Sequence, residues 1–176
     1  MLDFCRAFRF VNSAHGAKCT EVLKKRTRKK WESEHKDYAL TYVWGMDLNE
    51  KRRADRLVEG MPQFKHEFPL IENGLSKQEA HGICARLGIK RPLMYDLGYS
   101  NNNCVGCVEG GAGYWNKIRK DFPEVFADRA KMEREIGHSI LHNQNGMIFL
   151  DELDPNAGRM EKEIMEDCSI FCQLNI

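Results

Sequence analysis

With 176 residues, of which 42% are hydrophobic, the chain is long enough for one ordinary hydrophobic core. It has no apolar run near the roughly 18 residues of a membrane-spanning helix, which argues against a membrane protein and predicts a soluble one. The net charge of +1 favours no class of partner. The first residues lack the apolar stretch of a secretory signal, so we expect a cytoplasmic protein.

The first half of the chain alternates between helical and strand-like patterns. Apolar spacing, aromatic content and a Ser-x-x-Glu capping box predict helix, helix, strand, helix, strand and helix, over residues 2–10, 18–34, 38–44, 49–59, 66–71 and 76–88. The stretch 38–44 is continuously apolar, as in a strand buried on both faces. The order predicts a partial parallel α/β sheet flanked by helices, over residues 1–90.

The second half, residues 91–176, has a different character. A loop with two cysteines leads through a glycine-rich stretch, and a helix is expected over 123–136. Apolar segments at 139–141 and 147–150 flank an Asn-Gly pair, which predicts a β-hairpin. We therefore expect an α/β fold whose C-terminal part is a cysteine-rich, metal-bound subregion, with the whole chain forming one compact domain.

Four cysteines occur as two close pairs, Cys104 with Cys107 and Cys168 with Cys172. Four thiolates complete a tetrahedral metal site, and Gly106 permits a tight turn between the first two. Both zinc and a [4Fe–4S] cluster accept four thiolates, and zinc is preferred because a closed site would tether the tail.

The other cysteines carry different expectations. Cys5 and Cys84 fall in apolar helical patterns and are expected in the core. Cys19 lies at a loop-to-helix junction, where the helix dipole and the following cations would lower a thiol pKa. It is therefore either a reactive thiol, an additional metal ligand or a packed junction residue.

Several groups could contact an anion. The run Lys24–Lys30 holds six cations in seven residues, and Arg53 ends another cationic run. Gly110 and Gly111 precede a helix and could present backbone N–H groups to a phosphate. Each of these features is also typical of an ordinary surface or turn.

Four motifs occur in the order found in one known family. They lie at residues 15–25, 42–53, 92–107 and 110–115. Together they resemble the phosphoadenosine phosphosulfate reductase family, in particular its phage and bacterial branch, over nearly the whole chain. The resemblance implies an adenine-nucleotide α-hydrolase-like fold with a parallel sheet between helices. The family's Ser-Gly-Gly-Lys-Asp-Ser phosphate loop does not occur in this sequence, which therefore looks like the C-terminal part of that fold.

The resemblance also implies roles for individual residues. Lys24, Lys25 and Arg53 match cations that hold phosphate or sulfate groups in relatives. The segment from Asp167 to Phe171 loosely resembles the family's Glu-Cys-Gly-Leu-His motif, in which the cysteine is a nucleophile. Cys168 is thus either a catalytic nucleophile or a metal ligand, and Cys172 nearby favours the ligand.

Three functions follow from these features. The first is a non-catalytic, metal-stabilised remnant of the sulfonucleotide-reductase fold that binds a macromolecule, such as a phage protein acting on a host system. The second is a reductase or sulfur-transfer component that needs a separate phosphate-loop subunit. The third is nucleic-acid binding through Lys24–Lys30. A protein partner or self-association is expected, since a partial sheet leaves an edge uncovered.

Overall fold

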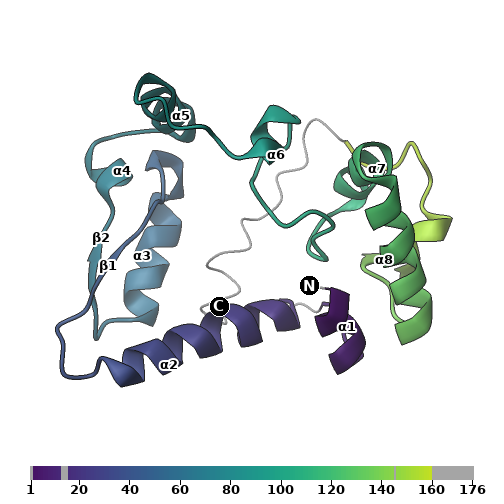
Figure 1. Ribbon diagram of the computed structural model, residues 1–176, viewed down its shortest axis with the longest axis horizontal. Coiled ribbons are helices and arrows are strands. Elements are labelled where there is room, and N and C mark those ends of the chain that lie inside the picture. The colour runs from purple at the N-terminus through teal and green to yellow at the C-terminus, as the bar shows by residue number, and fades with distance from the viewer. Residues whose placement is uncertain (1, 13–15, 145, 160–176) are drawn as a thin grey trace. The chain divides into compact units, whose positions relative to one another are not determined.

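The computed structural model describes residues 2–12, 16–144 and 146–159. It is a mixed α/β protein in which helices predominate and the described strands form two small sheets (Figure 1). The chain divides into two compact units. Unit 1 comprises residues 2–28 and 93–159, and unit 2 comprises Lys29–Pro92. Residues 2–28 thus group with the C-terminal half of the chain.

Unit 1 is largely helical. Its elements are α1 (Leu2–Phe8), the π-helix η1 (Thr20–Arg26), α6 (Leu93–Asp96), α7 (Ala112–Asp121), α8 (Pro123–Ile136), β3 (Leu141–Asn143), β4 (Gly146–Ile148) and the 3₁₀ turn η3 (Leu150–Glu152). Helix α2 (Thr27–Glu34) continues directly from η1 into unit 2. The expected helices at 2–10, 18–34 and 123–136 are therefore confirmed, with small shifts at their ends.

The core of unit 1 lies around α7 and α8. Trp115 and Ile118 of α7, Met132 of α8 and Leu150 of η3 are all fully buried. Each such side chain contributes on the order of 2 kcal/mol by leaving water. Pro123 begins α8 directly after α7, because proline fits the first helical turn, where an N–H would have no partner.

The hairpin of β3 and β4 is antiparallel, with Leu141 opposite Ile148 and Asn143 opposite Gly146, which confirms the predicted hairpin. The buried Glu133 of α8 fastens both of its ends. Its carboxylate accepts the backbone N–H of Ile140 before β3 and that of Leu150 after β4, the latter at 2.6 Å.

Unit 2 is built around one βαβ motif. Its elements are β1 (Thr41–Val43), the 3₁₀ turn η2 (Leu48–Glu50), α3 (Lys51–Gly60), β2 (Lys65–Glu67), α4 (Pro69–Glu72) and α5 (Lys77–Arg86). Strands β1 and β2 are parallel, with Tyr42 opposite His66. A parallel α/β region is thus confirmed, although the sheet has only two short strands. The second strand was expected to run to residue 71, but Pro69 begins a helix.

The two faces of this sheet differ. Rings of Tyr42, Trp44, Phe64 and His66 contact one another on one face, with centroid separations of 5.2 to 6.2 Å. Trp44 Nε1 donates to His66 Nδ1 at 3.0 Å. On the other face Val43 is 64% exposed. The prediction of a strand buried on both faces is wrong, because successive side chains point to opposite faces and only one face is covered.

Among the described residues, no helix is both long and apolar enough to cross a membrane.

Candidate functional site

The first candidate is the loop Cys104–Cys107 of unit 1, between α6 and α7. The hydroxyl of Tyr114 donates to the carbonyl of Cys104 and accepts the N–H of Cys107, both at 3.0 Å. The Nε of Arg129 donates to the carbonyl of Gly106 at 3.0 Å. Three hydrogen bonds from two helices therefore hold the backbone between the two cysteines.

Gly106 is required in this loop for two reasons. Its φ of 69° lies in the left-handed region, which costs any other residue about 1 kcal/mol or more. In addition, a Cβ atom at this position would lie 2.7 Å from Cγ1 of Val125 and 3.3 Å from Nε of Arg129. The tight turn expected at Gly106 is confirmed.

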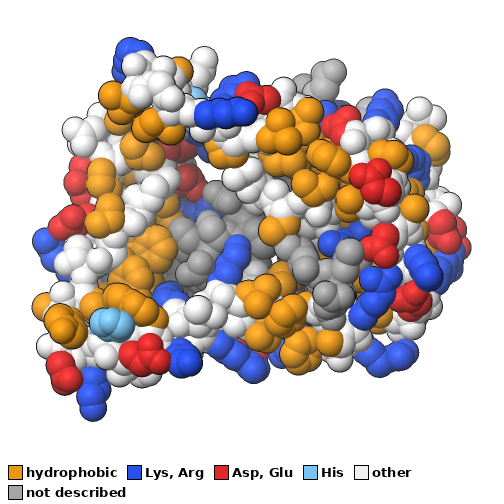
Figure 2. Space-filling model, viewed as in Figure 1, with side chains coloured by type: hydrophobic (Ala, Val, Ile, Leu, Met, Phe, Trp, Pro, Cys, Tyr) orange, Lys and Arg blue, Asp and Glu red, His pale blue; other side chains and the backbone are white. Residues whose placement is uncertain are grey.

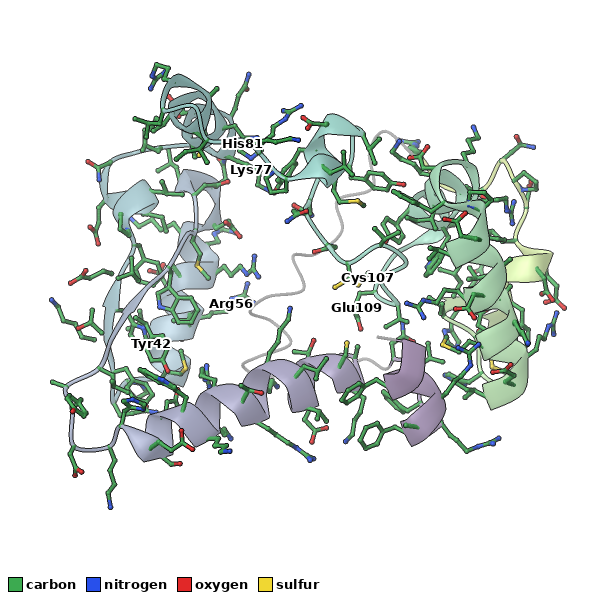
Figure 3. All side chains as sticks on the ribbon, viewed as in Figure 1. Tyr42, Arg56, Lys77, His81, Cys107 and Glu109 are labelled. Atoms are coloured by element: carbon green, nitrogen blue, oxygen red, sulfur yellow. The ribbon has the colours of Figure 1, made fainter. Side chains whose placement is uncertain are left out.

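The two thiols of the loop differ in exposure. Cys107 is 3% exposed and belongs to the core, whereas Cys104 is exposed. Figure 3 shows Cys107 and Glu109 on the same loop. The other two expected ligands, Cys168 and Cys172, lie outside the described residues, and with them the catalytic role suggested for Cys168.

The metal site is not found in the part of the chain that the structure describes. No group of three or more His, Cys, Asp or Glu residues there could hold an ion. The chemistry of the loop fits half of a tetrahedral thiolate site, since two cysteines flank a turn of fixed geometry. A complete site needs further ligands.

The other thiols that the structure describes differ in burial. Cys5 is 4% exposed, as expected for a core residue, while Cys84 is half-buried. Burial raises the pKa of the Cys19 thiol, and the nearby Cys5 adds to this rise, while hydrogen bonds from Thr20 and the charge of Lys24 only partly oppose it. The expected lowering of the Cys19 pKa is therefore wrong, because burial outweighs the dipole and the cations.

The glycines before α7 serve close packing. Gly111 caps the helix, and a Cβ on Gly110 would lie 2.1 Å from the ring of Tyr114. A Cβ on Gly113 would lie 2.8 Å from the backbone of Arg159. The chain at Gly158 and Arg159 thus crosses the beginning of α7, where Gly110 and Gly111 were expected to receive an anion.

The cations expected to hold phosphate are distributed over both units. Lys24 and Lys25 lie on η1 in unit 1, whereas Arg53 lies on α3 in unit 2. Arg53 is 8% exposed and its Nη1 donates to Glu50 at 2.5 Å. Arg53 is therefore an internal ion-pair partner and is not presented on the surface.

The second candidate is a pocket of about 700 Å³ within unit 2. It lies between the end of α2, the turn that follows it and the beginnings of both strands. Its lining includes three lysines and three rings, Lys29, Lys36, Lys65, His35, Tyr38 and Phe64.

A row of rings borders this pocket. The rings of Trp31 and His35 stack at 4.2 Å with an interplanar angle of 21°, and that of Tyr38 follows at 5.9 Å. Trp31 is 47% exposed and Tyr38 is 71% exposed. Nδ1 of His35 donates to the carbonyl of Trp31 at 2.8 Å, which fixes its ring. Figure 2 shows hydrophobic side chains near the end of α2, with Lys or Arg and Asp or Glu side chains beside them.

Cations predominate in the lining of the pocket. Its one carboxylate, that of Glu32, accepts the hydroxyl of Tyr42. Lys65 pairs with Glu67 at 2.7 Å. Lys29 and Lys36 form no ion pair with any residue that the structure describes. Two lysines are thus available to an incoming anion.

Sequence reasoning located the basic run but missed this pocket. Within the run, Arg26 pairs with Glu21 at 2.6 Å and Lys30 approaches Glu34 to 3.9 Å. The missed signal was the spacing of the rings of Trp31, His35 and Tyr38, which repeats at four and three residues, as on one side of a helix.

Comparisons of the chain with protein-family models, with curated proteins and with solved structures found no match.

Proposed function

We propose that the protein binds a macromolecular partner and catalyses no reaction, as a metal-stabilised relative of the phosphoadenosine phosphosulfate reductase family. The observation that carries this proposal is the pocket of unit 2. Exposed rings and two lysines that have no ion-pair partner among the described residues border a concave surface there. Such a combination provides both contact area and charge for a partner.

Two residues that were expected to contact a phosphate make internal contacts instead, which also supports binding over sulfonucleotide chemistry. Arg53 is buried against Glu50, and Gly110 is packed under the ring of Tyr114. Neither can contact a nucleotide phosphate without breaking an internal contact. A reductase would need such groups free beside its nucleophile.

The proposed metal is zinc, held by Cys104, Cys107, Cys168 and Cys172, with a [4Fe–4S] cluster as the alternative. A closed four-thiolate zinc site would supply stability rather than chemistry, because it leaves no open coordination position. The hydrogen bonds from Tyr114 and Arg129 support this proposal, since they fix the turn that carries the first two ligands.

Calorimetry with ATP and with phosphoadenosine phosphosulfate tests the proposed function. We expect no binding of either at micromolar concentrations, and no thiol-dependent release of sulfite from the sulfonucleotide. Saturable micromolar binding of either nucleotide would contradict a purely macromolecular role and favour the reductase or sulfur-transfer alternative.

A further inference from the structure

We propose that the partner is a single-stranded nucleic acid, bound with its bases on the ring row Trp31, His35 and Tyr38 and its phosphates at Lys29 and Lys36. This inference rests on the proposed binding function and names the partner's chemical class. We call these five residues the stacking surface. They lie on α2 and the turn that follows it, within unit 2.

The rings provide the first part of the argument. Every nucleobase has a flat π face, so an exposed ring can stack on any base without reading its sequence. The rings of Trp31 and His35 already stack at 4.2 Å with 21° between their planes, and about half of the Trp31 side chain is exposed. A nucleobase could extend this stack, because the ring of Trp31 is not fully buried in the fold.

The cations provide the second part. Lys29 and Lys36 flank the ring of His35 in sequence, and all three line the same pocket. A backbone that passes the pocket could pair one phosphate with each lysine while its bases face the rings. Lys65, at the same pocket, is already paired with Glu67 and contributes less.

Single strands fit this surface better than the alternatives. In a duplex the bases are stacked on one another and paired, so their faces cannot reach Trp31, and only the lysines would contribute. An acidic peptide would satisfy Lys29 and Lys36 but has no flat group for the rings. The combination of exposed rings with Lys29 and Lys36 therefore favours a single-stranded nucleic acid over both.

The test uses the full-length protein and a fluorescently labelled oligonucleotide of mixed sequence, as a single strand and as a duplex, followed by anisotropy. We expect tighter binding of the single strand. Trp31→Leu should weaken that binding about ten-fold while Trp31→Phe, which keeps a ring, stays near the wild type. Circular dichroism confirms that each variant is folded.

The lysines are tested by salt dependence. The double variant Lys29→Ala with Lys36→Ala should lower the slope of log affinity against log salt by roughly 0.7 for each lost phosphate contact. The matched control, Lys51→Ala with Lys90→Ala, removes the same charge from exposed positions of unit 2 outside the pocket and should leave the slope unchanged.

Several results would overturn the inference. These are equal affinity for duplex and single strand, wild-type affinity in Trp31→Leu, or equally tight binding of a labelled poly-glutamate peptide. Absence of oligonucleotide binding would also overturn it, yet would leave the proposed function standing if the calorimetry with both nucleotides is negative. Binding of the sulfonucleotide alone would instead contradict the proposed function.

Discussion

Nε of Arg129 donates a hydrogen bond to the carbonyl of Gly106 at 3.0 Å, from a side chain that is only 3% exposed. Burial lowers the pKa of this guanidinium. Its Nη1 is buried without a hydrogen-bond partner among the described residues. Burial of a charged guanidinium costs free energy. The burial of Arg129 against Gly106 therefore indicates that α8 holds the cysteine loop in one conformation.

Arg129→Ala should therefore destabilise unit 1 by about 2–3 kcal/mol, because it leaves the carbonyl of Gly106 buried without a donor and opens a cavity. Urea unfolding followed by circular dichroism measures this change. Arg52→Ala, at an exposed position of α3, serves as the control and should stay within about 0.5 kcal/mol of the wild type. Equal stability of both variants would contradict a fastening role for Arg129.

Gly106 and Gly98 form a matched pair for separating backbone strain from steric conflict. Both have positive φ, 69° and 80°, but a Cβ on Gly98 would meet nothing within 4 Å. Gly98→Ala should cost about 1 kcal/mol from the backbone alone. Gly106→Ala should cost clearly more, about 3 kcal/mol, because Val125 must move as well. If thermal denaturation showed similar losses of stability in both variants, the loop would accommodate a Cβ at residue 106 without additional strain.

Glu133 predicts a pH dependence of stability. Burial raises its pKa from 4.5 to about 7, although the N–H groups of Ile140 and Leu150 act in the opposite direction. A carboxyl whose pKa is higher in the folded than in the unfolded protein contributes its full stabilisation of the fold at pH values below the unfolded-state pKa. This contribution is lost as the pH rises through about 7. The loss between pH 4.5 and 7.5 is at most roughly 3 kcal/mol.

Urea unfolding of the wild type and of Glu133→Gln, measured between pH 5 and pH 8, tests this dependence. Glutamine cannot ionise, so the variant should show a flatter profile over this range. It should also be less stable at pH 5, because its amide would place a donor against one of the two backbone N–H groups. Parallel profiles would mean that Glu133 does not titrate in this range.

Elemental analysis and an absorption spectrum test the metal proposal. We expect about one zinc per chain and a colourless protein. Cys104→Ser should lose the metal and lower the melting temperature, whereas Cys84→Ser on α5, outside both cysteine pairs, should retain it. A brown protein that contains iron and sulfide would show that the site holds the [4Fe–4S] cluster and not zinc. A stable protein without metal would contradict both alternatives.

Cys168→Ser separates the metal proposal from the enzymatic alternative. A metal ligand should lose zinc and stability on replacement, without any effect on sulfonucleotide chemistry, since none is expected. A nucleophile should lose turnover in the presence of a phosphate-loop partner while the fold and the metal remain unchanged. Metal content and melting temperature therefore decide between these two roles.

Local signals in the sequence predicted local structure well. The capping box is present as expected, since the N–H of Ser76 donates to Glu79 at 2.8 Å and the N–H of Glu79 donates back at 3.3 Å. The hairpin was likewise predicted from the Asn-Gly pair in its sequence, and Gly146 of that pair lies opposite Asn143 in the ladder. Both depend only on residues close in sequence, and no distant contact needs to be known.

Features that depend on distant contacts could not be predicted. The glycines at 110–113 match both an anion-binding turn and a close crossing of two chain segments, and only the position of Arg159 distinguishes them. The pKa of Cys19 depends on burial, which outweighs the charges visible nearby in the sequence. The stacking surface was missed for a related reason, since the spacing of its rings does not reveal that Trp31 is half exposed.

The division of the chain has a consequence for folding kinetics. Unit 2 is continuous in sequence, whereas unit 1 joins residues 2–28 to residues 93–159 across the whole of unit 2. The contact of α1 with α8, which includes the ion pair of Arg6 with Asp128, closes a long loop of the chain. Closing this loop costs conformational entropy, and the cost increases with the length of flexible chain between the two helices. If unit 2 condenses first, it shortens this loop, so mutations in its βαβ motif should slow the assembly of unit 1 as well.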